Sequence, residues 1–127
     1  MTDNTLLLRQ IHPTFVQAGY ATSQAFRPTP KDESRLSVYD GDQIAAEESW
    51  VHYTNVLELD SAGTMAVTVA ECGELELPVI ADPDPFPEHT VIDFKGKTES
   101  QRRSKSKKLQ AMALQRGWLY RAQTSSH

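Results

Sequence analysis

Residues 64–71, Thr-Met-Ala-Val-Thr-Val-Ala-Glu, alternate between larger apolar side chains and small or polar ones. A period of two residues is typical of a β-strand whose two faces differ. Residues 75–79 alternate in the same way, and Cys72-Gly73 between the two stretches suits a turn. We therefore predict a β-hairpin with one solvated face, in which Pro78 places the second strand at a sheet edge.

The rest of the chain supplies further strands and two helices. Strands are predicted at 6–11, 36–39, 89–94 and 118–121, and helices at about 43–55 and 99–116. Asp42 is the expected N-cap of the first helix; Thr98 or Ser100 caps the second, which Gly117 ends. The proline-rich segment 82–88 predicts a stiff loop. The sequence thus predicts one α+β domain over 1–127, with a mostly antiparallel sheet of about five short strands and two helices, and loose ends at 1–4 and 122–127.

The charge of the chain is divided between two segments. Residues 1–94 contain four Lys or Arg and sixteen Asp or Glu, a net charge of −12, whereas residues 95–127 contain nine Lys or Arg and one Glu, a net charge of +8. The overall charge of −4 conceals this division. Such an asymmetry bears on partners rather than on the fold.

Several classes of protein are disfavoured by composition. No apolar run approaches the length of a membrane span, and the polar start of the chain lacks the features of a signal peptide. Cys72 is the only cysteine, so the chain forms no disulfide with itself. We therefore expect a cytoplasmic protein that does not contact a membrane.

The predicted helix over 99–116 has two unlike halves. Residues 99–108 contain no apolar side chain, whereas residues 109–114 hold all of the apolar ones. Because a helix is stabilised mainly by burying a face, we expect the second half to dock and the first half to project. The predicted partner-binding residues are the five cations of the first half: Arg102, Arg103, Lys105, Lys107 and Lys108.

These five cations lie near the N-terminus of the helix, where the macrodipole disfavours positive charge, so we expect a negatively charged group to compensate for them. An acidic segment of the same chain, a second copy or an acidic protein partner would do so, and a merely solvated helix start is the alternative. Nucleic acid is disfavoured as the partner. Residues 99–108 carry no aromatic ring for base stacking, and the −12 segment repels phosphates.

Arg9 interrupts an otherwise apolar strand and needs a partner for its guanidinium, either an ion pair or an anionic ligand. Thr22-Ser23 and Glu74-Leu75-Glu76 follow it along the chain. This order resembles the arginine–serine–glutamate pattern of some ADP-ribosyltransferases, in which the Arg holds dinucleotide phosphates and a Glu stabilises the sugar cation. The resemblance implies a small nucleotide-binding enzyme. Its catalytic residues would be Arg9, Ser23, Glu74, Glu76 and His89, with the two glutamates on one strand face.

No metal or cofactor is predicted. His12, His52 and His89 are scattered, and none stands at metal-ligand spacing from another histidine or from the cysteine. Asp82, Asp84, Glu88 and His89 would suit a hard cation, yet no glycine-containing calcium loop is present. The six glycines are isolated and form no phosphate-binding loop.

A second resemblance covers about residues 8–92. Leu8-Arg9, Thr22-Ser23-Gln24-Ala25-Phe26, Leu36-Ser37-Val38 and Pro87-Glu88-His89 resemble the signature of small bacterial proteins of uncharacterised function. Those proteins carry Arg, Ser-x-Ala-Phe, Met/Leu-Ser-Val and Pro-Ala-His in this order. The resemblance implies no activity, but it marks Arg9, Ser23, Phe26, Ser37 and His89 as a polar signature that would form a buried network or a ligand pocket.

The sequence as a whole favours a non-enzymatic bacterial interaction protein, such as an immunity protein, an antitoxin-like protein or an accessory subunit that binds a protein partner. Small size, the lack of a catalytic motif and oppositely charged segments motivate this hypothesis. A small nucleotide-binding enzyme and a nucleic-acid-binding accessory that uses the basic helix are the alternatives.

Overall fold

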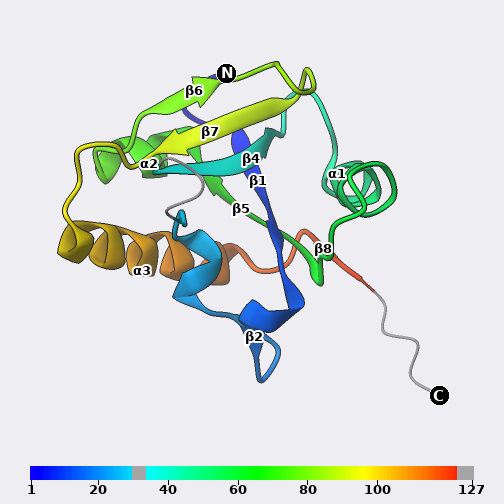
Figure 1. Ribbon diagram of the computed structural model, residues 1–127, viewed down its shortest axis with the longest axis horizontal. Coiled ribbons are helices and arrows are strands. Elements are labelled where there is room, and N and C mark those ends of the chain that lie inside the picture. The colour runs from blue at the N-terminus through cyan, green and yellow to red at the C-terminus, as the bar shows by residue number, and fades with distance from the viewer. Residues whose placement is uncertain (30–33, 123–127) are drawn as a thin grey trace.

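The computed structural model describes residues 1–29 and 34–122 and shows one small α+β domain (Figure 1). In these residues a six-stranded antiparallel sheet has the order β6-β7-β4-β1-β5-β8, and β2 and β3 form a separate two-stranded ribbon. The strands are β1 (Leu6–Ile11), β2 (Val16–Gln17), β3 (Tyr20–Ala21), β4 (Arg35–Asp40), β5 (Gly63–Thr68), β6 (Val79–Ala81), β7 (His89–Asp93) and β8 (Tyr120–Arg121). The helices are α1 (Ala46–Val51), α2 (Val69–Glu74) and α3 (Glu99–Arg116), with 3₁₀ turns η1 (Pro13–Phe15) and η2 (Ser23–Phe26) and a π-helical turn η4 (His52–Val56). The predicted fold class is confirmed.

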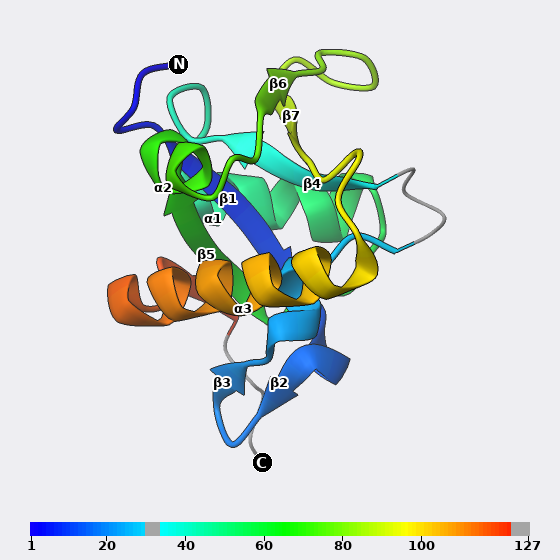
Figure 2. The ribbon, with the colours of Figure 1, turned by 90° about the vertical axis from the view of Figure 1, so that its left-hand side faces the viewer.

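Helices cover both faces of the sheet, with α3 in front of it and α1 behind it in the view of Figure 2. Alternate residues of β1 lie on the two faces of the sheet. Leu7 belongs to the main core beneath α3, and Leu8 belongs to a smaller cluster on the face covered by α1. The main core also holds Phe26, Phe94 and Leu109, all buried. The smaller cluster is where the candidate site lies.

A buried polar network attaches α1 to the sheet. The side-chain amide of Gln10 donates to Ser49 Oγ at 2.9 Å, and its Oε1 accepts from the hydroxyls of Ser61 and Thr64 at 2.9 and 3.0 Å. All four residues are buried. Because each of these polar groups has a partner, the network fixes the position of α1 without leaving an unsatisfied amide.

The predicted hairpin over 64–79 is wrong. Strand β5 ends at Thr68, whose hydroxyl accepts from the N–H of Glu71 while the Glu71 carboxylate accepts from the N–H of Thr68, a reciprocal capping box. The chain then forms α2, so Cys72 lies in a helix rather than in a turn. Strand β6 pairs with β7 instead of β5. Thr68-Val-Ala-Glu71 has the spacing of a capping box, and this local signal outweighs the period of two.

The helix predicted over 43–55 starts later and is shorter. Asp40 organises a turn, because its carboxylate accepts from the N–H of Asp42 at 2.9 Å and from the side chain of Gln43 at 2.8 Å. Asp42 is therefore not the N-cap; its own carboxylate accepts from the hydroxyl of Thr5. Helix α1 begins only at Ala46 and continues into the π-helical turn η4.

Helix α3 has the predicted bounds, Glu99–Arg116, with Thr98 as N-cap and Gly117 at φ +86° after it. The expectation that its first half projects is wrong. Ser106 is buried, Arg102 donates to Ser34 Oγ at 2.6 Å, and Lys105 donates to the carbonyl of Leu75. That carbonyl belongs to the C-cap of α2, where a cation is favourable. Arg103 is exposed but lies 3.9 Å from the carboxylate of Glu99, one turn earlier. Three of the five cations thus have partners within the protein, while Lys107 and Lys108 are exposed.

Arg116, in the last turn of α3, forms a forked ion pair with Glu71 of α2, at 3.1 and 3.3 Å, and also donates to the carbonyl of Ala66. Burial raises the pKa of Glu71, but the hydrogen bonds from Arg116 and Thr68 outweigh it and hold this pKa below its ordinary value. A lowered pKa contributes stability above the ordinary pKa of a glutamate, and that contribution is lost as the pH falls through the folded value.

Replacing Glu71 by Gln should therefore lower the free energy of unfolding by about 1 kcal/mol near neutral pH, and the difference should shrink below about pH 4. Urea unfolding of both proteins as a function of pH measures this difference. A difference that stays constant down to about pH 3 would show that the ion pair makes no acid-sensitive contribution.

Both ends of the described chain are attached by backbone hydrogen bonds. The carbonyl of Asp3 accepts from Ala70, and the N–H of Ala122 donates to Ala62. Residues 123–127 of the end predicted to be loose lie outside the described residues.

Candidate functional site

Strands β1 and β4 separate at one end of the sheet and leave room for a site. Their pairing includes Leu7 with Asp40 and Leu8 with Tyr39, and beyond this point Arg9 links β1 to neighbouring elements. Its Nη1 donates to the carbonyl of Ser37 at 2.9 Å, and its Nε donates to that of Ala25 at 2.9 Å. Backbone carbonyls thus serve as partners for the arginine that interrupts an apolar strand.

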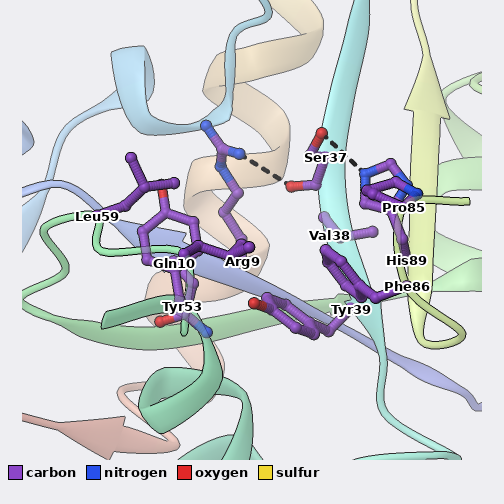
Figure 3. A pocket seen from close by; sticks show the side chains of 11 residues that line it. Arg9, Gln10, Ser37, Val38, Tyr39, Tyr53, Leu59, Pro85, Phe86 and His89 are labelled. Atoms are coloured by element: carbon purple, nitrogen blue, oxygen red, sulfur yellow. Dashed lines mark hydrogen bonds between the residues drawn. The ribbon is translucent and has the colours of Figure 1, made fainter. Parts of the chain in front are cut away.

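A pocket of about 360 Å³ opens at this separation (Figure 3). Residues from β1, β4, η4 and β7, from the segment after η4 and from the segment before β7 surround it. The lining residues are Arg9, Gln10, Ser37, Val38, Tyr39, Tyr53, Leu57, Leu59, Pro85, Phe86 and His89. This volume lies at the lower end of the range typical of small-molecule sites.

An aromatic cluster forms one wall of the pocket. The rings of Tyr39 and Phe86 are stacked with centroids 5.1 Å apart, and His52 lies against both. The Tyr39 hydroxyl is 2.7 Å from Nδ1 of His52. Burial, with smaller contributions from Tyr53 and Glu88, raises the pKa of Tyr39 far above its ordinary value. The phenol therefore stays protonated and shares a hydrogen bond with Nδ1 of His52.

Beside this cluster the side chains of Ser37, His89 and Asp82 follow one another, and the centroid of the His89 ring lies 5.2 Å from that of Phe86. The hydroxyl of Ser37 is 3.1 Å from Nε2 of His89, as Figure 3 shows. Nδ1 of His89 lies 3.0 Å from the carbonyl oxygen of Asp82 and 3.3 Å from its carboxylate oxygen Oδ2. The imidazole is largely buried, whereas Ser37 is exposed to the pocket.

The structure brings together three of the five residues of the polar signature. Arg9, Ser37 and His89 line the same pocket. Phe26 lies in the main core instead, and Ser23 begins η2 outside the pocket lining. These two residues belong to the 3₁₀ turn η2, whose Ala25 carbonyl accepts from Arg9, but neither lines the pocket.

The glutamates of the predicted nucleotide site are not on a strand face. Glu74 is the last residue of α2, and Glu76 has a left-handed backbone with φ +59°. Both are exposed, and neither lines the pocket that holds Arg9 and His89. The arrangement implied by the ADP-ribosyltransferase resemblance is therefore wrong for this pair, because the capping box turns their segment into a helix.

Sequence reasoning missed Tyr39, Tyr53 and Phe86 as site residues, since lone aromatic residues carry no motif. The contact between Asp82 and His89, in contrast, had a signal in the sequence. The two residues flank a proline-rich loop between two short strands, and such positions face each other at the mouth of a hairpin.

A second pocket of about 400 Å³ lies at the N-terminus of α3. Glu99 occupies this helix start and lies 3.9 Å from Nη1 of Arg27. The favourable position for an anion is therefore taken by a carboxylate of the same chain.

The fold and site together define a small α+β domain with one aromatic-lined pocket. No protein-family model, no curated protein and no solved structure matches this chain. Among residues 1–29 and 34–122, no three or more His, Cys, Asp or Glu side chains are grouped to hold a metal ion. In the same residues no helix has both the length and the apolar character needed to cross a membrane.

Proposed function

We propose that this chain is an interaction protein that binds another protein across the mouth of the aromatic-lined pocket. The observation that carries the proposal is a run of exposed apolar side chains beside that pocket. Val51, Val56, Leu57 and Leu59 are all exposed, Val56 to 66 % and Leu59 to 48 %. Leu57 and Leu59 also line the pocket, so the apolar surface and the hollow are continuous. Exposed apolar patches of this kind mark interaction sites.

A pocket within an apolar patch suits the anatomy of a protein interface. Interface energy is concentrated where one aromatic or apolar side chain fills a pocket on the partner. Here Tyr39 and Phe86 form the wall that such a side chain would contact. Arg9, Ser37, Tyr39 and His89 each have a hydrogen-bond partner within the protein, so an apolar anchor would not leave these side chains unsatisfied.

The charge of the surroundings favours a basic partner. Glu58 and Asp60 alternate with the leucines of the apolar run, and Asp84 and Glu88 flank the pocket-lining Pro85 and Phe86. Acidic residues around an apolar centre attract a segment that carries Lys or Arg beside its anchor. An immunity or antitoxin-like role, in which an acidic protein covers a basic one, agrees with this surface.

The basic helix contributes a second candidate surface through Arg103, Lys107 and Lys108. A second copy of the chain would offer these cations to the acidic rim of the pocket, and nucleic acid would contact them through phosphates. The −12 segment opposes the nucleic-acid alternative.

An array of short peptides tests the proposal, each with one Leu, Phe or Trp flanked either by Lys and Arg or by Asp and Glu. We expect the basic set to bind and the acidic set not to bind. Leu59→Asp should weaken binding at least tenfold, about 1.4 kcal/mol, because it places a charge in the apolar patch.

Tyr20→Ser is the matched control, since Tyr20 is exposed to 65 % but lies on β3, outside the pocket lining. It should leave binding unchanged. Equal binding of both peptide sets, or no loss with Leu59→Asp, would refute the proposal. Light scattering of the variant with Arg103, Lys107 and Lys108 all replaced by Glu reports separately on self-association through α3.

A further inference from the structure

The line of Ser37, His89 and Asp82 has a defined direction of hydrogen bonding. Nδ1 of His89 faces two acceptors, the carbonyl and the carboxylate of Asp82. Nδ1 must therefore carry the ring proton, and in the neutral imidazole Nε2 is left as an acceptor. The hydroxyl of Ser37 accordingly donates to Nε2. A serine hydroxyl directed at a histidine base, with a carboxylate behind the base, is the arrangement that activates a nucleophile.

Two strand registers place these three side chains. Tyr39 of β4 pairs with His89 of β7, so Ser37, two residues earlier, is the diagonal neighbour of His89 on the same face. The N–H of Asp82 donates to the carbonyl of His89 at 2.9 Å, and the N–H of His89 donates to that of Phe86 at 3.0 Å. These two hydrogen bonds close the loop between Asp82 and His89, so the backbone that carries the imidazole is held in place.

We propose that Ser37 is a nucleophile and that the pocket performs acyl transfer on esters of small apolar or aromatic acids. Ser37 Oγ attacks the ester carbonyl carbon, and its proton passes to Nε2 of His89. The bond from that carbon to the leaving alcohol breaks, and the alcohol takes the proton from His89. Water then attacks the acyl-Ser37 ester by the same route, which releases the acid and restores the hydroxyl. Asp82 is a positioning residue that stabilises the imidazolium formed between these steps.

The lining of the pocket sets the class of acyl group. Tyr39, Phe86 and Leu57 offer rings and an aliphatic side chain next to Ser37 and His89. The exposed carboxylate of Asp84 and the half-buried carboxylate of Glu88 nearby disfavour an anionic acyl group. A volume of about 360 Å³ holds a small ring or a short chain. This activity goes beyond the partner binding proposed above and does not depend on it.

Labelling with a fluorophosphonate tests the nucleophile, because its P–F bond breaks as Ser37 Oγ bonds to phosphorus and fluoride leaves. Intact mass and peptide mapping should show one adduct, on Ser37. Ser37→Ala should abolish the adduct, and His89→Gln should slow labelling at least about 100-fold. Ser23→Ala, the matched control outside the pocket, should label at the original rate. Thermal unfolding of each variant checks that the fold is intact.

Asp82→Asn tests whether the carboxylate of Asp82 does more than hold the His89 imidazole in place. The backbone carbonyl of residue 82 still holds the imidazole, so labelling should slow by only about tenfold. The melting temperature should stay unchanged, because the backbone hydrogen bonds that close the loop remain; slower labelling at an unchanged melting temperature is the result expected of a positioning residue. An adduct on Tyr39, or no adduct on the folded protein, would overturn the proposal. Loss of peptide binding by Leu59→Asp bears only on the proposed function.

Discussion

Replacing Gly63 by Ala should lower the free energy of unfolding by about 3 kcal/mol, which for a domain of this size lowers the melting temperature by about 10 °C. Gly63 begins β5 with φ +157°, and a Cβ there would lie 2.6 Å from the carbonyl oxygen of Tyr120 and 2.9 Å from the Trp118 ring. The first of these atoms is backbone and has no rotamer to change. The last strand, β8, must therefore move away from β5.

Gly73→Ala is the matched control for this substitution. Gly73 lies inside α2, and a Cβ there meets no atom within 4 Å. Because glycine weakens a helix interior, alanine should raise the free energy of unfolding by about 0.5–1 kcal/mol. The two glycines should thus give changes of opposite sign in denaturant unfolding. A loss below about 1 kcal/mol for Gly63→Ala would contradict the close packing of β8 on β5.

Replacing Phe26 by Ala should lower the free energy of unfolding by about 3–5 kcal/mol. Phe26 is 1 % exposed and lies in the main core with Leu109 and Ala113 of α3. The 3₁₀ turn η2 that carries it packs directly against α3. Truncation leaves a cavity that neither the turn nor the helix is free to fill, and calorimetry or urea unfolding measures the loss.

Phe26→Leu retains most of the apolar volume, so it should cost less than about half as much as Phe26→Ala. Equal losses for the two variants would show that the ring shape, rather than the volume, is what the core requires. A loss below about 1 kcal/mol for Phe26→Ala would mean that η2 does not support α3. The turn η2 also positions Arg9, because the Ala25 carbonyl accepts a hydrogen bond from its guanidinium. A displaced η2 should therefore also disturb the Arg9 side chain.

Much of the fold could be predicted because its signals are local. The bounds of α3 follow from Thr98, an apolar second half and Gly117, and β1 and β7 follow from short apolar runs. The error at 64–79 arose where two local signals competed. The alternation of Val67 and Val69 suits a strand, but the capping box at Thr68 decides the structure.

The candidate site was harder to predict because it depends on pairing between strands. The polar signature named five residues, of which the structure brings together Arg9, Ser37 and His89, whereas Ser23 and Phe26 lie outside the pocket. The proline-rich loop between Asp82 and His89 indicated that the two residues would be close, but their contact also needs the β6–β7 pairing, which the sequence analysis did not predict. The basic helix was misjudged for a related reason. The partners of Arg102 and Lys105 are an uncharged hydroxyl and a carbonyl from distant segments, not carboxylates.

The order of strands in the sheet has a consequence for synthesis of the protein. β1 lies between β4 and β5, and β7 is already made when residue 94 emerges from the ribosome. At that stage the emerged chain contains every described strand except β8, yet α3, the helix that covers its main apolar face, is still inside the ribosome. Until α3 arrives, that face is open to chaperones and to other nascent chains. A ribosome that stalls before residue 99 would therefore release an aggregation-prone sheet rather than a shortened working protein.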